Sequence, residues 1–419
     1  MNFSMENINF YILFLAFLFV ELLVEFYLAI RNRLSIHNNR NQVPDDFKEF
    51  IQIEDHQKAA EYQITLIDFG FVFRMYGLLI LLFWTLGGYL SKLSLYSSAV
   101  TTNNYLNGVV LLLSFSLINL ILSLPVSIIK TFHIEEKFGF NNTKYKTFAL
   151  DKLKGFIISS LITIPIFIAI AYFINLFENN WWIYSYVLFM LFQFVLLWIY
   201  PTVIAPIFNK FNKLDNPVYE EKINSLLERT DFEAKGLFVM DGSTRSNHGN
   251  AYFTGFGKNK RIVFYDTLLA TLKPGEVESV LAHELGHYKL KHIWKSILTS
   301  MVVSLAGFYL LYTIFYVDTF FVDHGLDHLT TYSKIYLFSL VIGVYTFFTT
   351  PVSSFFSRKR EFESDNYSIE YSNGENMITA LIKLIKDNAS TLTPDNLYSA
   401  YYYSHPPASE RINNIKNQL

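Results

Sequence analysis

The chain contains no cysteine. Disulfide bonds, thiol catalysis and cysteine-based metal sites are therefore excluded, and any bound metal ion must be held by histidine, aspartate or glutamate. A strong charge of one sign is also absent, because the formal net charge is only −2. Nothing in this balance attracts nucleic acid, so we expect no nucleic-acid partner. Internal repeats and low-complexity tracts are missing as well.

The chain is instead rich in apolar residues. They make up 52% of it, and the mean hydropathy of +0.25 is too high for a soluble protein of 419 residues. The first apolar stretch has neither a basic leader nor a small-residue cleavage site, so we do not expect a cleaved signal peptide. Pro201 and Pro206 predict a kink or an early exit near the end of the fifth. Seven stretches reach the roughly 20 residues that cross a bilayer, namely 10–30, 69–90, 107–129, 155–177, 181–208, 293–317 and 332–356.

Lysine and arginine concentrate in alternate connecting segments. Segments 31–68, 130–154 and 209–292 are rich in them, and Arg358-Lys359-Arg360 follows the seventh span. The other connections are nearly bare of positive charge. By the positive-inside rule, the N-terminus lies outside or in a lumen, and the C-terminus is cytosolic.

The segment His283-Glu284-Leu285-Gly286-His287 has the HExxH pattern of zinc proteases and lies in a helical run, 276–292. Residues four apart share a helix face, so His283 and His287 can bind one metal ion. Glu284 lies one step around the helix, near a metal-bound water. The alternative is a surface helix that carries two histidines by chance. On the predicted topology this helix lies at the cytosolic face.

A catalytic zinc site takes three protein ligands and a water, so a third ligand must come from elsewhere. Glu361 and Asp365 lie four apart just beyond the seventh span, at the same level of the membrane. We interpret Glu361 as the ligand and Asp365 as the residue that holds a ligand histidine through its second ring nitrogen. Glu363 points elsewhere and is a weaker candidate. The alternative is a charged helix start solvated by lipid headgroups.

This ligand set predicts one zinc ion per chain and a hydrolytic reaction. Zinc lowers the pKa of its bound water to about 7, and Glu284 acts as general base. His405 and Arg411 are candidate donors to the oxyanion, although a histidine beside two prolines can also be an ordinary surface loop. An edge strand at 250–253 can pair with an extended peptide, the alternative being aromatic core packing.

The predicted fold is a mainly α, polytopic membrane protein with a gluzincin-like zinc protease domain that contains a small β-hairpin or sheet. Glycine, lysine and asparagine at 257–259 mark the turn of that hairpin. We divide the chain into 1–209, 210–292, 293–356 and 357–419, which hold spans one to five, the soluble HELGH block, spans six and seven, and a helical polar block. Within these blocks we expect a loop at 32–41, helices at 216–230 and 267–272, and strands at 236–241, 250–256 and 261–265.

Four charged residues fall within or at the edge of spans one and two. Charges at membrane depth are costly and usually face protein or water. They are either a structural pair that holds two helices together or the lining of a polar internal cavity, and the sequence leaves both readings open. These residues are Glu21, Glu25, Asp68 and Arg74.

Several motifs resemble the type I CAAX prenyl proteases, the membrane zinc metalloproteases that process prenylated proteins. The resemblance covers the chain from about residue 60 to its end, and the compact bacterial stress-induced membrane proteases are a poorer match. The motifs are HELGH, REFESD, SNHGNAYFTGF (246–256), NKRIVFYDTLL (259–269), IEEKFGFN (134–141), IAPIFNKF (204–211) and SHPPASERI (404–412).

The resemblance implies seven transmembrane helices around a water-filled chamber that the zinc domain closes on the cytosolic side. It implies zinc ligands at His283, His287 and Glu361, a base at Glu284 and support from Asp365. It also implies that His405 and Arg411 lie by the scissile bond, and that peptides or prenylated protein C-termini are cut after the prenylated cysteine. The substrate-binding segment then comprises His248, Asn250, Ala251, Tyr252 and Phe253.

Ser364 and Asn366 stand where the family commonly has alanine, which indicates a bacterial or divergent member in a bacterial inner membrane or the ER membrane. We expect a monomer whose partners are its substrates and the lipid bilayer. A general quality-control protease for membrane proteins, or a partly non-proteolytic chaperone, is the alternative function. A transporter is a further alternative, although no inverted repeat with interrupted helices is evident.

Overall fold

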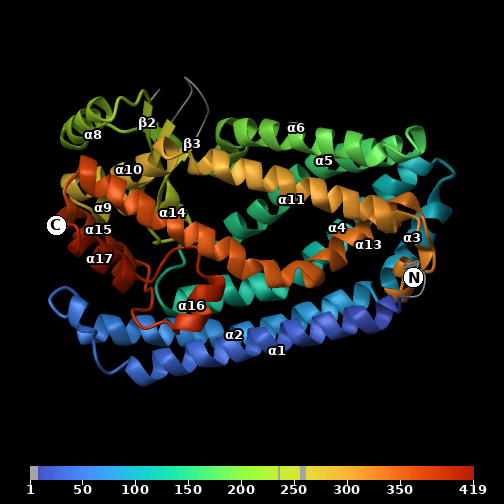
Figure 1. The fold of residues 1–419 in the computed structure, drawn as a ribbon, viewed down its shortest axis with the longest axis horizontal. Helices are drawn as coiled ribbons and strands as arrows, with labels where there is room; N and C mark the ends of the chain where they lie inside the picture. The colour runs from blue at the N-terminus through green and yellow to red at the C-terminus, as the bar shows by residue number, and fades with distance from the viewer. Residues whose placement is uncertain (1–7, 235, 255–260) are drawn as a thin grey trace, which may run out of the picture.

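Long apolar runs fold into long helices, because a helix satisfies its own backbone hydrogen bonds in lipid. The computed structural model describes residues 8–234, 236–254 and 261–419. The helices lie along the long axis of an elongated molecule, and the sheet lies at the end opposite the N-terminus (Figure 1). Short helices α3 (Tyr89–Val100) and α12 (Asp318–Asp323) lie near the N-terminal end.

Within the described residues, seven helical segments are long and apolar enough to cross a membrane, which confirms the predicted fold class. The third ends in a π-helix, and the fifth and seventh are each assembled from several helices. The segments are Phe10–Asn39 (α1), Ile53–Trp84 (α2), Asn104–Glu135 (α4, Asn104–Ile129), Tyr145–Leu176 (α5), Trp181–Phe208 (α6, Trp181–Ile199, and α7, Ala205–Phe208), His292–Phe315 (α11) and Thr331–Tyr371 (α13, Thr331–Thr346, and α14, Thr350–Tyr371).

The predicted loop at 32–41 is wrong for most of its length, since α1 continues to Asn39. Contacts distant in sequence stabilise this polar extension: the side-chain oxygen of Asn32 accepts a hydrogen bond from the backbone N–H of Asp395 at 3.0 Å, and Ile36 is fully buried. The second span differs at its other end. Helix α2 stops at Trp84, and Gly88 at φ +71° turns the chain within a run that is still apolar.

Prolines shape two of the spans. In the fifth, a π-helix at Tyr200–Ile204 contains Pro201, which has no N–H to donate, so the predicted irregular end is present. In the seventh, a 3-10 turn at Phe347–Thr349 precedes Pro351 in the first turn of α14. Helix α14 then continues to Tyr371, so the predicted division at 356/357 falls inside one helix. Glu361 therefore lies on the same unbroken helix as the end of the seventh span.

A four-stranded sheet forms the centre of the soluble block. Strands β2 (Gly236–Met240) and β4 (Arg261–Tyr265) are parallel, and β3 (Ala251–Thr254) pairs antiparallel with β4, which confirms the predicted hairpin. The predicted turn at 257–259 lies outside the described residues. An unpredicted short strand, β1 (Phe211–Lys213), extends the other side, so the order is β1-β2-β4-β3. Strand β3 is therefore at the edge.

Helix α10 (Pro274–Lys289) carries the HELGH motif between two partners. On one side its apolar residues, such as Leu281 and Leu285, are buried in a core that also contains Phe264 of the sheet. On the other side it packs on α14, where a Cβ at Gly286 would lie 3.0 Å from the Cα of Ser364. The glycine thus permits the close approach of the two helices. The surrounding helices are α8 (Pro217–Arg229), α9 (Asp266–Thr271), α15 (Gly374–Asp387), α16 (Asn396–Tyr402) and α17 (Ala408–Lys416).

The charges in the first two spans both link two helices and line a cavity, so the two interpretations given above hold together. Arg74 pairs with Glu21 and with Glu25, so the charges link α1 to α2. Arg74 and Glu25 also line a cavity of about 430 Å³, together with Tyr402 of α16. None of the residues in the apolar window of α2 is buried, although α1 packs beside it. The apolar residues of α2 are therefore only partly covered by the rest of the chain.

Candidate active site

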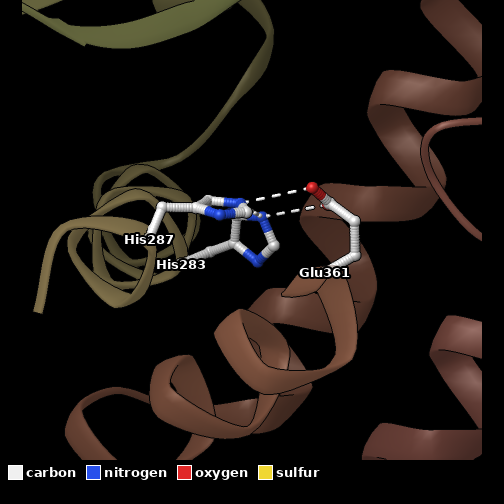
Figure 2. A group of neighbouring side chains, drawn as sticks. All are labelled: His283, His287 and Glu361. Atoms are coloured by element: carbon white, nitrogen blue, oxygen red, sulfur yellow. Dashed lines mark hydrogen bonds and ion pairs between the residues drawn. The ribbon is translucent and has the colours of Figure 1, made fainter. Parts of the chain in front are cut away.

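Three side chains from two helices converge at the soluble end of the bundle. His283 and His287 project from one face of α10, and Glu361 projects toward them from α14 (Figure 2). The two Nε2 atoms lie 3.3 Å apart, and the Glu361 carboxylate oxygens lie 3.4 Å from Nε2 of His283 and 3.3 Å from Nε2 of His287. Residues 74 positions apart in the chain therefore present donor atoms to a single point.

These spacings fit a tetrahedral metal ion. Ligand atoms at about 2.0–2.1 Å from a tetrahedral zinc are separated from one another by about 3.3 Å. The two nitrogens are 3.3 Å apart, and Oε2 and Oε1 of Glu361 lie 3.4 Å from the His283 nitrogen and 3.3 Å from the His287 nitrogen, respectively. In addition, Oε2 of Glu361 is buried and has no hydrogen-bond partner. Three donor groups facing one another at this distance suit a shared cation, and His283, His287 and Glu361 could hold it.

The outward nitrogen of His283 is held by a carboxylate. Its Nδ1 lies 2.8 Å from Oδ1 of Asp365, a fully buried residue that also accepts two hydrogen bonds from Arg411, at 2.8 and 2.6 Å. Burial alone would lower the pKa of His283, but the Asp365 and Glu361 carboxylates raise it to about 9. The hydrogen bond to Asp365 directs Nε2 toward the shared point.

The outward nitrogen of His287 is held by a second histidine, which the sequence analysis did not identify. Nδ1 of His287 lies 3.0 Å from Nδ1 of His292, a buried residue at the start of α11. Nε2 of His292 lies 2.8 Å from the Glu363 carboxylate. A third histidine five residues after His287 could have indicated this contact. That Glu363 is the partner of His292 is visible only in the structure, where α14 lies beside the start of α11.

A cleft of about 580 Å³ opens beside the three converging residues. Glu284 lines it together with His283 and Glu361, and burial raises the pKa of Glu284 despite the two nearby histidines. The beginning of the edge strand, Asn250 and Ala251, lines another side. A carboxylate that holds protons more readily than in water, placed next to a metal-binding pair, suits proton transfer.

His405 and Arg411 lie on the wall of this cleft. Nε2 of His405 is 3.4 Å from Oε1 of Glu361, and its pKa is lowered because the cleft desolvates the ring more than the Glu361 carboxylate compensates. Arg411 is buried and uses Nε and Nη2 to bind Asp365, which leaves Nη1 3.8 Å from Glu361. Both residues can donate a hydrogen bond beside the shared point.

The rest of the predicted substrate-binding segment lies in different surroundings. Tyr252 and Phe253 line a second cavity of about 830 Å³, which borders His287 and Glu361 and continues between the membrane helices α6 and α11. His248 is not among the residues that line either cavity. Its ring faces Glu135 and Asn388 instead.

A seven-span helical bundle with a centre of two histidines and one carboxylate defines a membrane-embedded metalloenzyme. Residues 32–210 match the family described as CAAX prenyl protease N-terminal, five membrane helices, and residues 213–419 match peptidase family M48. The chain therefore belongs to the CAAX prenyl protease family of membrane metalloproteases.

Individual relatives agree along nearly the whole length. The CAAX prenyl protease 1 homolog of Mus musculus is 32% identical over 96% of this chain and 94% of its own. That of Arabidopsis thaliana is 33% identical over 96% of each. The crystal structure of S. mikatae Ste24p superposes with a TM-score of 0.90 at 28% identity, covering 98% of this chain and 99% of that one.

Proposed function

We propose that this protein is a zinc endopeptidase that cleaves CAAX-type C-termini of prenylated proteins after the lipidated cysteine. The observation that carries the hydrolytic chemistry is the convergence of His283, His287 and Glu361 at mutual distances of 3.3 to 3.4 Å. Two imidazoles and a carboxylate are a usual donor set for catalytic zinc. The substrate class rests on the family membership and on the names of the relatives.

The residues of the chain take distinct parts in this reaction. Bound zinc supplies Lewis acidity, which polarises a carbonyl and lowers the pKa of water. Glu284 accepts a proton from the attacking water and returns it to the leaving amine. The free edge of β3 aligns an extended peptide along the cleft that Asn250 lines. His405 and Nη1 of Arg411 donate to the oxygen on which negative charge develops.

We place the protein in the ER membrane with its catalytic block in the cytosol. The support is the alternation of lysine-rich and lysine-poor connections, since positive segments remain on the cytosolic side. The extension of α14 beyond the bundle then carries Glu361 to the cytosolic surface, where prenylated C-termini are found. We propose that one chain with one zinc ion is the active unit.

The proposal is tested by following a farnesylated CAAX peptide and its unprenylated twin with mass spectrometry, using metal-loaded protein in liposomes. We expect one cut after the farnesyl-cysteine, release of the last three residues, and faster turnover of the lipidated peptide. Equal turnover of both peptides would reject the lipid requirement. Absence of cleavage by fully metal-loaded protein would reject the peptidase itself.

We expect His292→Phe to weaken zinc binding by about 10- to 100-fold, because the partner that orients the His287 ring is lost. The phenyl ring fills the buried site of His292, so the fold should persist. Zinc affinity is measured by competition with a coloured chelator. Lys295→Met is the matched control, because Lys295 lies 3.7 Å from Glu363 but does not touch His287. Equal affinities in wild type and His292→Phe would contradict the prediction.

A further inference from the structure

A polar junction joins the membrane helices to the beginning of strand β3. It comprises Tyr62 of α2, Glu135 at the end of the third membrane segment, Phe140, His248 and Asn388. Two motifs noted in the sequence, 134–141 and 246–256, meet here. The first has no part in the chemistry described above, and the second enters it only through the residues at the beginning of β3. The isolated bridge between Asn141 and Ser246 links them directly.

His248 is held on three sides. Its Nδ1 lies 2.9 Å from the side-chain oxygen of Asn388, and its Nε2 lies 3.6 Å from the carboxylate of Glu135. The ring stacks on Phe140, with centroids 4.4 Å apart and planes at 21°. An amide oxygen and a carboxylate can only accept hydrogen bonds, so both ring nitrogens face acceptors. The doubly protonated imidazolium presents an N–H to each of them, in a hydrogen bond to Asn388 and in a longer ion pair with Glu135.

Glu135 is the last residue of a π-helix at Lys130–Glu135, which continues α4. Single π-turns inside α-helices are uncommon and occur frequently at functional sites. The widened turn changes the direction in which the following side chains leave the helix. The Glu135 carboxylate accepts a hydrogen bond from the Tyr62 hydroxyl at 2.9 Å and faces His248 with its other oxygen. Two membrane helices therefore share one carboxylate that points out of the bundle.

The segment just before β3 is also bonded to the loop that follows Glu135. The backbone N–H of Asn247 donates to the Phe140 carbonyl at 3.2 Å, and its side-chain amide donates to the Gly139 carbonyl at 2.8 Å. On the other side, the His248 carbonyl accepts from the Thr267 hydroxyl at 3.0 Å. Gly249, Asn250 and Ala251, the next three residues, line the cleft beside the metal-binding side chains. The direction in which β3 enters the cleft is thus set at His248.

We propose that Glu135 and His248 are positioning residues, an ion pair that fixes the beginning of β3 against the membrane helices so that its edge receives the substrate peptide. The proposal rests on the proposed function, in which the edge of β3 binds the substrate peptide. It moves His248 from direct substrate contact to a role that acts through Asn250 and Ala251. It also assigns a role to the acidic residue of the 134–141 motif, because Glu135 pairs with His248.

A pH effect follows from the charge of His248. Glu135 raises the pKa of His248 above its ordinary value of 6.5, against the opposing effects of burial and of Lys130. The other titratable groups nearby are Tyr62, bonded to Glu135, and Lys58, which lies 5.7 Å from the Phe140 ring. A raised pKa means that the pair stabilises the junction fully below pH 6.5 and loses this effect as the pH rises through the raised value.

The test compares Glu135→Gln and His248→Gln with Glu221→Gln, an exposed acid on helix α8 that is not part of the junction. We expect each junction variant to raise KM about tenfold at pH 6, with zinc affinity unchanged, and the control to match wild type. The double variant should be no worse than either single variant, since the pair acts as a unit. In wild type KM should rise at alkaline pH, and this rise should be absent in both junction variants.

Hydrogen exchange supplies a readout that needs no turnover. Amides at 245–251 should exchange about tenfold faster in Glu135→Gln and in His248→Gln than in Glu221→Gln. Unchanged exchange there, additive effects of the two substitutions, or a loss of zinc affinity would overturn the proposal. If metal-loaded wild type does not cleave the peptide, the proposed function fails, while the exchange comparison still decides whether the junction holds β3.

Discussion

Glu284→Gln is expected to retain zinc and to lose peptide cleavage by about a thousandfold or more, because a positioned general base contributes about 10²- to 10⁴-fold. Glutamine has nearly the same shape, so the packing of α10 against α14 should be unchanged. The carboxylate is not one of the three converging ligands. It lines the cleft beside them, and burial raises its pKa, as suits a group that takes up a proton and then returns it.

The measurements are the rate of product formation and the zinc content of the same sample by mass spectrometry. Glu410→Gln is the control, since it neutralises an exposed acid next to Arg411 without altering the cleft. Cleavage by Glu284→Gln at the wild-type rate would remove Glu284 from the mechanism. If this inactive variant still supported growth under membrane-protein stress, the chaperone alternative would gain support, because the chamber would then act without hydrolysis.

The membrane architecture could be predicted because hydropathy reports directly on burial in lipid. All seven spans and the hairpin of β3 and β4 follow from local composition and turn chemistry. The ends of the helices do not. Asn32 is polar, yet it is helical because Asp395, far along the chain, bonds to it. Local sequence contains no information about such a partner, so a polar stretch was interpreted as a loop.

The same distinction applies to the site. His283 and His287 are four apart, and helical geometry alone pairs them. The convergence of Glu361 follows from the requirement for a third ligand and from the hairpin of spans six and seven. The partners of His292 and His248 could not be found in this way. The first depends on how α14 lies against the start of α11, and the second on how the end of the third membrane segment meets the loop before β3. The sequence therefore predicted that His283, His287 and Glu361 converge and that Asp365 lies beside them, but not the contacts of His292 and His248.

Glu361→Gln is expected to weaken zinc binding by about a hundredfold or more. Zinc sites with four ligands bind with about 10–16 kcal/mol, roughly 3 kcal/mol per ligand, which corresponds to about 10²-fold in affinity. The amide oxygen is neutral and a poorer ligand than a carboxylate. Glu361 is 4% exposed, and no other carboxylate among the described residues is grouped with the His283–His287 pair as a possible metal ligand.

Chelator competition and thermal unfolding measure this loss together. Zinc at a thousand times the wild-type Kd stabilises wild type by about 4 kcal/mol, but a variant with a hundredfold weaker Kd by only about 1.4 kcal/mol. A chelator should therefore lower the Tm of wild type about three times as much as that of Glu361→Gln. Glu363→Gln is the matched control, because Glu363 lies two residues away on α14 and also faces a histidine, but that histidine is His292. If Glu363→Gln lost more zinc than Glu361→Gln, the third ligand would be Glu363, and the assignment to Glu361 would be wrong. Because the two acids differ chiefly in which histidine they reach, their comparison separates a ligand from a residue that only orients one.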